Sequence, residues 1–134
     1  MIGPPQEASS EDWTDSLRAM FPIARTTGFS CFGGWKPIVV RLLERLSLIV
    51  KELPPDERRT FTVVEIRQKF GTLTVYLSEG PTPAMWEAIG HAGEESMATC
   101  EVCGAPGTLA ERHGWRSVRC DPHENWSRFD RISG

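Results

Sequence analysis

Two short pairs of metal-ligand residues near the C-terminus constrain this chain more than any other feature. Cys100 and Cys103 form a C-x2-C pair, and Cys120 and His123 form a C-x2-H pair after the intervening residues 104–119. Each pair lets two ligands reach one ion from a single tight turn, and thiolates with imidazole are the ligands of tetrahedral Zn²⁺. The sequence therefore predicts one zinc ion bound by these four side chains, with iron as the alternative metal.

The number of ligands indicates a structural role for this zinc ion. A catalytic zinc ion usually keeps three protein ligands and one position open for water, whereas this pattern fills all four positions. We therefore expect no catalytic residue. A zinc-dependent hydrolase-type enzyme is the alternative if His123 does not bind the metal, and Glu101 or Glu124 would then be the acid or base.

Length and charge limit the remaining possibilities. A chain of 134 residues with 40% hydrophobic residues is long enough for one domain, and its net charge of -3 excludes a generally basic nucleic-acid-binding protein. The N-terminus has neither a basic nor an apolar segment typical of a secretion signal, and no apolar run reaches the length of a membrane span. We expect a cytoplasmic protein without membrane contact. The reducing cytoplasm also suits the clustered cysteines, and we expect Cys31, which stands apart, to be a small buried hydrophobic residue.

The first half of the chain predicts two helices. Residues 1–8 are expected to be a disordered tail, and Ser9 or Ser10 can cap a short helix that ends before Pro22. The glycine-rich segment 25–35 is expected to be a loop. Residues 37–53 then repeat apolar side chains with a period near 3.6, which is typical of an amphipathic core helix.

A β-hairpin and a third helix follow. Residues 60–70 and 72–78 are rich in β-branched and aromatic residues around Gly71, which predicts two strands and a tight turn that cover the long helix. Alternation places Val64, Ile66 and Phe70 on the buried face of the first strand. Thr82 and Pro83 are typical of a helix start, and the pair His91 and Glu95 is interpreted as part of a solvated helix face.

The C-terminal segment predicts a small module around the metal. Residues 107–118 are typical of a hairpin with His113 in its turn, and Trp115 and Trp126 are expected to form a hydrophobic shell around the zinc ion. A short helix should follow, from which Trp126 and Phe129 pack back on the domain. The predicted fold class is α+β, with helices packed on a β-hairpin and a C-terminal zinc knuckle of treble-clef or zinc-ribbon type. We expect a single domain over residues 1–134, with a helix-helix-hairpin-helix core over 9–99 and a zinc-binding module over 100–126.

The order of these motifs resembles a set of small bacterial and phage proteins of unassigned activity. The resemblance covers about residues 13–125 and rests on the segments "GGWKPIVVRLLERL", "EIRQKFGTLTVYL", "ESMATCEVCGAPGTL" and "GWRSVRCDPH". It implies the same helix, hairpin and zinc segment, and it suggests a role in phage or toxin-immunity conflict. Thr74 and Val75 depart from the pattern, which has a basic and an aromatic residue at these positions.

These features favour a non-catalytic module that binds another protein. The expected contact surface is the polar face of the hairpin, formed by Glu65, Arg67, Lys69, Thr74 and Tyr76. A nucleic-acid-binding regulator is the alternative, and it would need a basic stripe in three dimensions. The candidates for that stripe are Arg58, Arg59, Arg67, Lys69, Arg116 and Arg119. The sequence does not indicate an oligomeric state.

Overall fold

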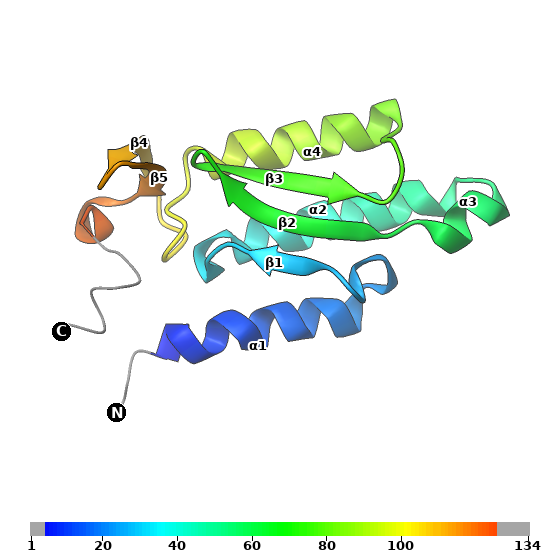
Figure 1. The fold of residues 1–134 in the computed structure, drawn as a ribbon, viewed down its shortest axis with the longest axis horizontal. Helices are drawn as coiled ribbons and strands as arrows, with labels where there is room; N and C mark the ends of the chain where they lie inside the picture. Colours follow the sequence, from blue (N-terminus) through cyan, green and yellow to red (C-terminus); the bar gives the residue numbers. More distant parts are fainter. Residues whose placement is uncertain (1–4, 126–134) are drawn as a thin grey trace.

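The computed structural model describes residues 5–125, with side chains described from Trp13 onward. Within this range a three-stranded sheet has the order β1-β2-β3, and a separate two-stranded sheet pairs β4 with β5 (Figure 1). The prediction of a mixed α+β fold is confirmed. The helices are α1 (Pro5–Met20), α2 (Lys36–Lys51), α3 (Pro55–Thr60) and α4 (Pro83–Ser96), with the 3-10 turns η1 (Pro22–Ala24), η2 (Gly33–Trp35) and η3 (Asp121–His123). The strands are β1 (Gly28–Ser30), β2 (Val63–Lys69), β3 (Thr72–Leu77), β4 (Thr108–Arg112) and β5 (Trp115–Arg119).

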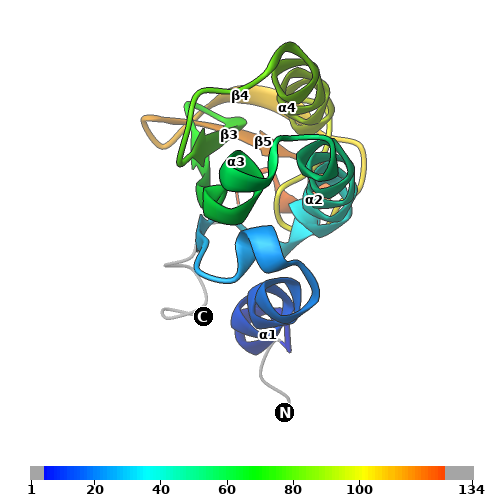
Figure 2. The same ribbon diagram turned by 90° about the vertical axis from the view of Figure 1, so that its right-hand side faces the viewer.

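Helix α2 is the central element of the core, as its apolar period predicts. Pro37 lies in its first turn, where a missing backbone N–H leaves no hydrogen bond unmade. Its buried side chains are Ile38, Val39, Leu42, Leu43, Leu46 and Val50. Helices α2 and α4 lie on the same side of the three-stranded sheet, while α1 lies along the β1 edge (Figure 2). No helix in the described range is both long and apolar enough to span a bilayer.

Three boundaries differ from the sequence predictions. Helix α1 begins at Pro5, earlier than the predicted start at Ser9 or Ser10, so part of the expected tail is helical. The expected loop over residues 25–35 contains β1, which pairs in parallel with β2. A strand of three residues is too short to show an alternating pattern in the sequence. The pair Pro54-Pro55 ends α2 as expected, but Pro55 also begins α3, because proline fits the first turn of a helix.

The register of β2 corrects the predicted core. A bulge between Val63 and Glu65 shifts the strand, so Val63 is fully buried and Val64 is 50% exposed. Phe70 was predicted to be buried, but it lies in the turn before β3 and is 71% exposed. Only Ile66 of the three predicted apolar positions lies in the core. The extra residue at the bulge changes the faces of Val63 and Val64 relative to the rest of the strand, which strict alternation cannot anticipate.

The register also defines a polar face of the sheet. Glu65 pairs with Tyr76 and Arg67 pairs with Thr74, so these four side chains project from one face, together with Lys69 and Thr72. We call this the outer face. Ile66 and Leu73, which belong to the opposite face, are buried. Helices α2 and α4 lie on that side of the sheet (Figure 2). The predicted grouping of Glu65, Arg67, Lys69, Thr74 and Tyr76 on one side of the hairpin therefore agrees with the register.

Candidate metal centre

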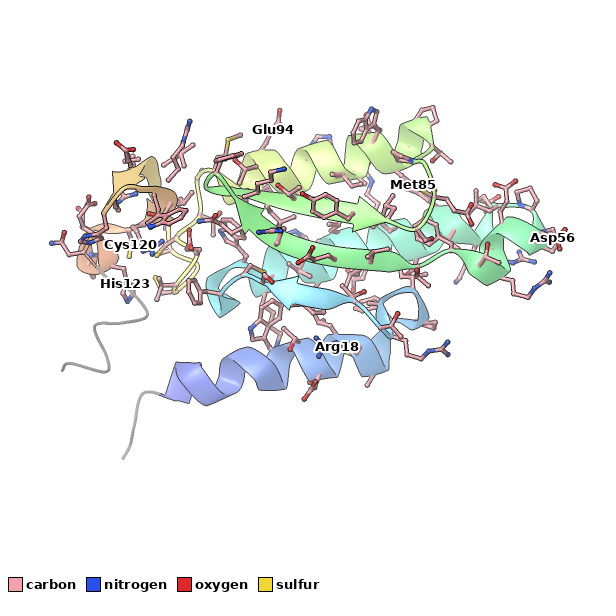
Figure 3. The ribbon with its side chains drawn as sticks, viewed as in Figure 1. Arg18, Asp56, Met85, Glu94, Cys120 and His123 are labelled. Carbon is pink, nitrogen blue, oxygen red and sulfur yellow. The ribbon has the colours of Figure 1, made fainter. Side chains whose placement is uncertain are left out.

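The four predicted ligands lie together at one end of the molecule, beside β4 and β5. Figure 3 labels two of them, Cys120 and His123, which lie close together at this end. The ligand atoms of Cys100, Cys103, Cys120 and His123 all lie within 4.8 Å of one another. The Sγ atoms of Cys103 and Cys120 are 3.6 Å apart, and the Nδ1 atom of His123 lies 3.2 Å from Cys120 Sγ and 3.8 Å from Cys100 Sγ.

The separations of 3.2, 3.6 and 3.8 Å are close to the edges of a tetrahedron around one ion. Zinc bonds of about 2.3 Å to sulfur and about 2.0 to 2.1 Å to nitrogen place sulfur atoms about 3.8 Å apart, and sulfur and nitrogen about 3.6 Å apart. A disulfide is excluded by the same distances, because a covalent S–S bond is about 2.0 Å long. The cluster could therefore bind a metal ion through one nitrogen and three sulfur atoms.

Two tight turns bring the ligands to this geometry. The first turn is closed by the N–H of Gly104, which donates to the Cys100 carbonyl at 2.8 Å, and Gly104 has a φ of +87°. A residue with a Cβ atom is strained at this φ, so glycine is required after the second cysteine. The second turn is η3, in which the His123 N–H donates to the Cys120 carbonyl at 3.1 Å. Both C-x2 spacings thus correspond to one turn of chain.

The thiols have perturbed pKa values. Burial opposes ionisation of Cys100, but hydrogen bonds from the backbone N–H groups of Cys120, Cys103 and Val102 outweigh it and lower the pKa of Cys100. Burial, together with the neighbouring thiols Cys103 and Cys100, raises the pKa of Cys120 to about 11. A divalent cation would supply the positive charge that lets several thiolates share this small space.

The metal-binding segment is joined to the core at the start of α2. The Gly34 N–H donates to the Glu101 carbonyl at 2.9 Å, and the Nε1–H of the fully buried Trp35 donates to the Thr99 carbonyl at 2.9 Å. A Cβ atom at Gly34 would lie 2.4 Å from the Cys100 carbonyl oxygen. The "GGW" segment is therefore shaped to receive the backbone next to the first ligand. We call these contacts the joint.

A buried ion pair lies beside the joint. The Nη1 atom of Arg119 lies 3.0 Å from Glu101 Oε2, and the two side chains are only 9% and 3% exposed. The same carboxylate accepts the Val118 N–H at 3.1 Å, and Gln68 of β2 contacts it at 3.4 Å. Gln68 also donates to the Arg116 carbonyl at 3.0 Å. Glu101 thus connects the first ligand pair, β5 and the three-stranded sheet.

A second ion pair holds the end of the described chain. Arg112 of β4, whose side chain is 7% exposed, forms two parallel hydrogen bonds to Glu124 at 3.0 and 3.1 Å. These hydrogen bonds lower the pKa of Glu124. The two carboxylates considered as an acid or base, Glu101 and Glu124, are therefore both held by arginines.

Several predicted neighbours of the metal lie elsewhere. Trp115 is 77% exposed, so its predicted place in a hydrophobic shell is wrong; the His113–Gly114 turn leaves it at the outer end of the hairpin. His113 lies in that turn as predicted. Trp126 and Phe129 lie outside the described residues. Cys31 is partly buried against the core, and burial raises its pKa to about 12.

The predicted basic stripe does not form as a whole. Arg119 points into the buried ion pair, and Arg59 is paired with Asp56 at 2.9 Å. Asp56, which belongs to α3, lies at the opposite end of the molecule from Cys120 and His123 (Figure 3). Arg67 and Lys69 lie on the outer face, but Arg58 and Arg59 lie on the distant α3. The six basic residues therefore do not make one continuous surface.

The residues of the joint were not identified from the sequence. Gly34 and Trp35 precede the ligands by more than sixty positions, so no local pattern connects the two segments. The adjacency of two glycines and a tryptophan before a helix was the available signal, since a close approach of two backbones requires a residue without a side chain. Glu101 and Arg119 each lie next to a ligand cysteine, which gave a second signal.

Comparison with known proteins adds no relative. No family model matches the chain, and no curated protein or solved structure is significantly similar to it. The resemblance to small bacterial and phage proteins therefore stays a prediction.

Proposed function

We propose that this protein is a zinc-stabilised, non-catalytic module that binds another protein through its outer face. In this proposal Zn²⁺ is structural and closes a treble-clef or zinc-ribbon-like unit at the end of an α+β core. The proposed compartment is the cytoplasm, where cysteine ligands stay reduced. The resemblance to phage proteins supports a role in phage or toxin-immunity conflict.

The structural role of the metal is supported by the ligand set. Cys100, Cys103, Cys120 and His123 supply four ligand atoms at tetrahedral separations, and such a set leaves no position for a water molecule. The carboxylates beside the site, Glu101 and Glu124, are occupied by Arg119 and Arg112. Neither is a free acid or base, which argues against the alternative of a zinc-dependent hydrolase.

The proposed binding role is supported mainly by the exposure of the outer face. Helices α2 and α4 bury the opposite face, whereas no described helix lies over the outer face (Figure 2). Its exposed residues include Arg67 and Tyr76, residue types that dominate binding energy at protein interfaces. Mixed polar and aromatic composition is typical of a transient protein interface.

The metal role is tested by two matched cysteine substitutions. Cys103→Ser removes an exposed ligand, and Cys31→Ser removes a thiol that lies outside the cluster. We expect wild type and Cys31→Ser to contain one zinc per chain by elemental analysis. We expect Cys103→Ser to contain less zinc and to melt at a lower temperature. A zinc-free wild type, or equal melting of both variants, would reject the structural role.

The binding role is tested by affinity capture with a surface variant as control. Tyr76→Ala changes the outer face, and Trp86→Ala changes an exposed residue of α4. Proteins retained by wild type and by Trp86→Ala, but not by Tyr76→Ala, would support the proposal. The capture is repeated after nuclease treatment. Loss of all retained material under nuclease would favour the nucleic-acid-binding alternative instead.

A further inference from the structure

Three exposed side chains of the main hairpin, two next to its turn and one from β3, form one contact group. The Nζ atom of Lys69 lies 3.5 Å from the hydroxyl of Tyr76 and 5.9 Å from the centre of the Phe70 ring. Arg67 projects from the same face of β2 as Lys69. We call Arg67, Lys69, Phe70 and Tyr76 the outer-face cluster. It combines two cations with two aromatic rings.

The backbone of Phe70 adopts a conformation that is unfavourable for an aromatic residue. Phe70 has a φ of +55° and Gly71 a φ of +82°, which is the two-residue turn that prefers asparagine followed by glycine. A bulky side chain at such a φ is rare and strained. Phe70 is also 71% exposed, so the part of the chain that the structure describes does not bury its ring to offset the strain. A partner that covers the ring would provide that burial.

The two cations of the cluster form no ion pair with a carboxylate of the described residues. Six ion pairs join side chains of the described residues, and none of them includes Arg67 or Lys69. The chain as a whole has a net charge of -3, so this local positive charge is opposite in sign to the protein. Such a patch attracts an anionic group of a partner.

We propose that the outer-face cluster binds an acidic segment of the partner protein that carries an aromatic or long aliphatic side chain. The partner's carboxylates contact Arg67 and Lys69, and its apolar side chain packs on Phe70 and Tyr76. This inference rests on the proposed function and names the chemistry of the partner.

A protein segment fits this cluster better than a nucleic acid. Glu65 pairs with Tyr76 on the same face, so the positive charge of this face is confined to Arg67 and Lys69 and does not continue as a long track for a phosphate backbone. Arg119, which the basic stripe would need, points into the ion pair with Glu101. Nucleic-acid binding depends on many phosphate contacts, whereas two cations suffice for a short acidic segment.

The test is selection from a phage-displayed library of random peptides against the zinc-loaded full chain. The bait is compared with the charge-reversed variant Arg67→Glu/Lys69→Glu. The matched control is Arg25→Glu/Lys51→Glu, which reverses two exposed cations away from the outer face. The variant Tyr76→Ala is measured alongside, and thermal melts first establish that all four proteins are folded. Selected peptides and a single-stranded oligo(dT) are then measured separately by fluorescence anisotropy.

We expect wild type and control to select peptides enriched in aspartate, glutamate and aromatic residues. Their affinity for the charge-reversed variant should fall about tenfold or more, which corresponds to about 1.4 kcal/mol. Peptides that need Tyr76 but show no acidic enrichment would overturn this inference and leave the proposed function standing. Peptides insensitive to both Tyr76→Ala and the charge reversal, or no selected peptides, would count against both. Binding of oligo(dT) that the charge reversal abolishes would overturn the inference in favour of a nucleic acid.

Discussion

Gly34 contacts the backbone of the metal-binding segment at Cys100 and Glu101. A single methyl group at Gly34 should therefore push this segment away from the start of α2. In Gly34→Ala the added Cβ would lie within 2.6 Å of backbone atoms of Cys100 and Glu101. Backbone cannot move aside as a side chain does, and we expect a loss of about 3 kcal/mol in the free energy of unfolding, measured by denaturant titration.

Gly90 supplies the matched control for this substitution. No heavy atom lies within 4 Å of a Cβ built at Gly90, which belongs to α4. Gly90→Ala should therefore stabilise the protein by about 0.5 to 1 kcal/mol, because alanine favours a helix more than glycine does. Similar effects of the two substitutions would contradict the close approach at the joint.

Phe70 is a residue at which stability and binding should change in opposite directions. Phe70→Asn keeps the turn and relieves the strain at a positive φ, because asparagine tolerates this region. We expect the free energy of unfolding to rise by up to about 1 kcal/mol, while binding of the selected acidic peptides weakens. Trp86→Asn is the control at an exposed position of α4, where the backbone is helical and no gain is expected. A destabilised Phe70→Asn would mean that the ring supports the fold.

At the scale of elements, the buried ion pair connects β5 to the first ligand pair. Glu101→Gln removes the carboxylate charge and leaves Arg119 in a site where its side chain is 9% exposed. Loss of one partner of a buried pair costs about 3 to 5 kcal/mol, and we expect a loss of that order by thermal or chemical unfolding. Glu95→Gln breaks the exposed ion pair with Arg41 and should cost less than about 1 kcal/mol. Equal losses would show that the burial of Glu101 has no energetic consequence.

The elements that the sequence identified correctly are those with a long or local pattern. The apolar period of α2 and the Thr82-Pro83 start of α4 were confirmed, and Thr82 Oγ1 accepts the Met85 N–H at 3.2 Å. The four ligands were predicted from their spacing, and they lie together in the structure. Each of these signals is contained within one segment of the chain.

The elements that the sequence missed depend on distant partners. Strand β1 exists because Gly28–Ser30 pairs with β2, and the bulge that turns Val63 inward is visible only in the β2–β3 register. The joint connects Gly34 to Glu101. Trp115 was misplaced because a hydrophobic residue near a metal pair says nothing of which side of a hairpin faces the ion.

At the scale of the whole molecule, removal of the metal should lower the local stability of the end that contains β4 and β5 more than that of the α2 core. The hydrophobic core is centred on α2 and α4, and the second sheet adds to it Val118 of β5, with Leu109 of β4 packed against it. Other contacts of β4 and β5 run through the joint and through Gln68, which donates to the Arg116 carbonyl. We expect a chelator to increase hydrogen exchange over residues 98–120 and at the turn around Gly71, while amides of α2 stay protected. Return of zinc should restore the protection. Equal loss of protection in α2 would mean that the core does not hold its structure without the metal.

The joint also has a consequence for the order of folding. Gly34 and Trp35 are synthesised long before Thr99 and Glu101, their hydrogen-bond partners. During translation, the Gly34 N–H and the Trp35 indole N–H therefore lack these hydrogen-bond partners until the C-terminal segment leaves the ribosome. Contacts between such distant positions form late, because closure of a long loop costs entropy. A metal ion held by Cys100, Cys103, Cys120 and His123 would therefore bind late in folding, and a nascent chain stalled after α4 would lack the Thr99 carbonyl that accepts the Trp35 indole N–H.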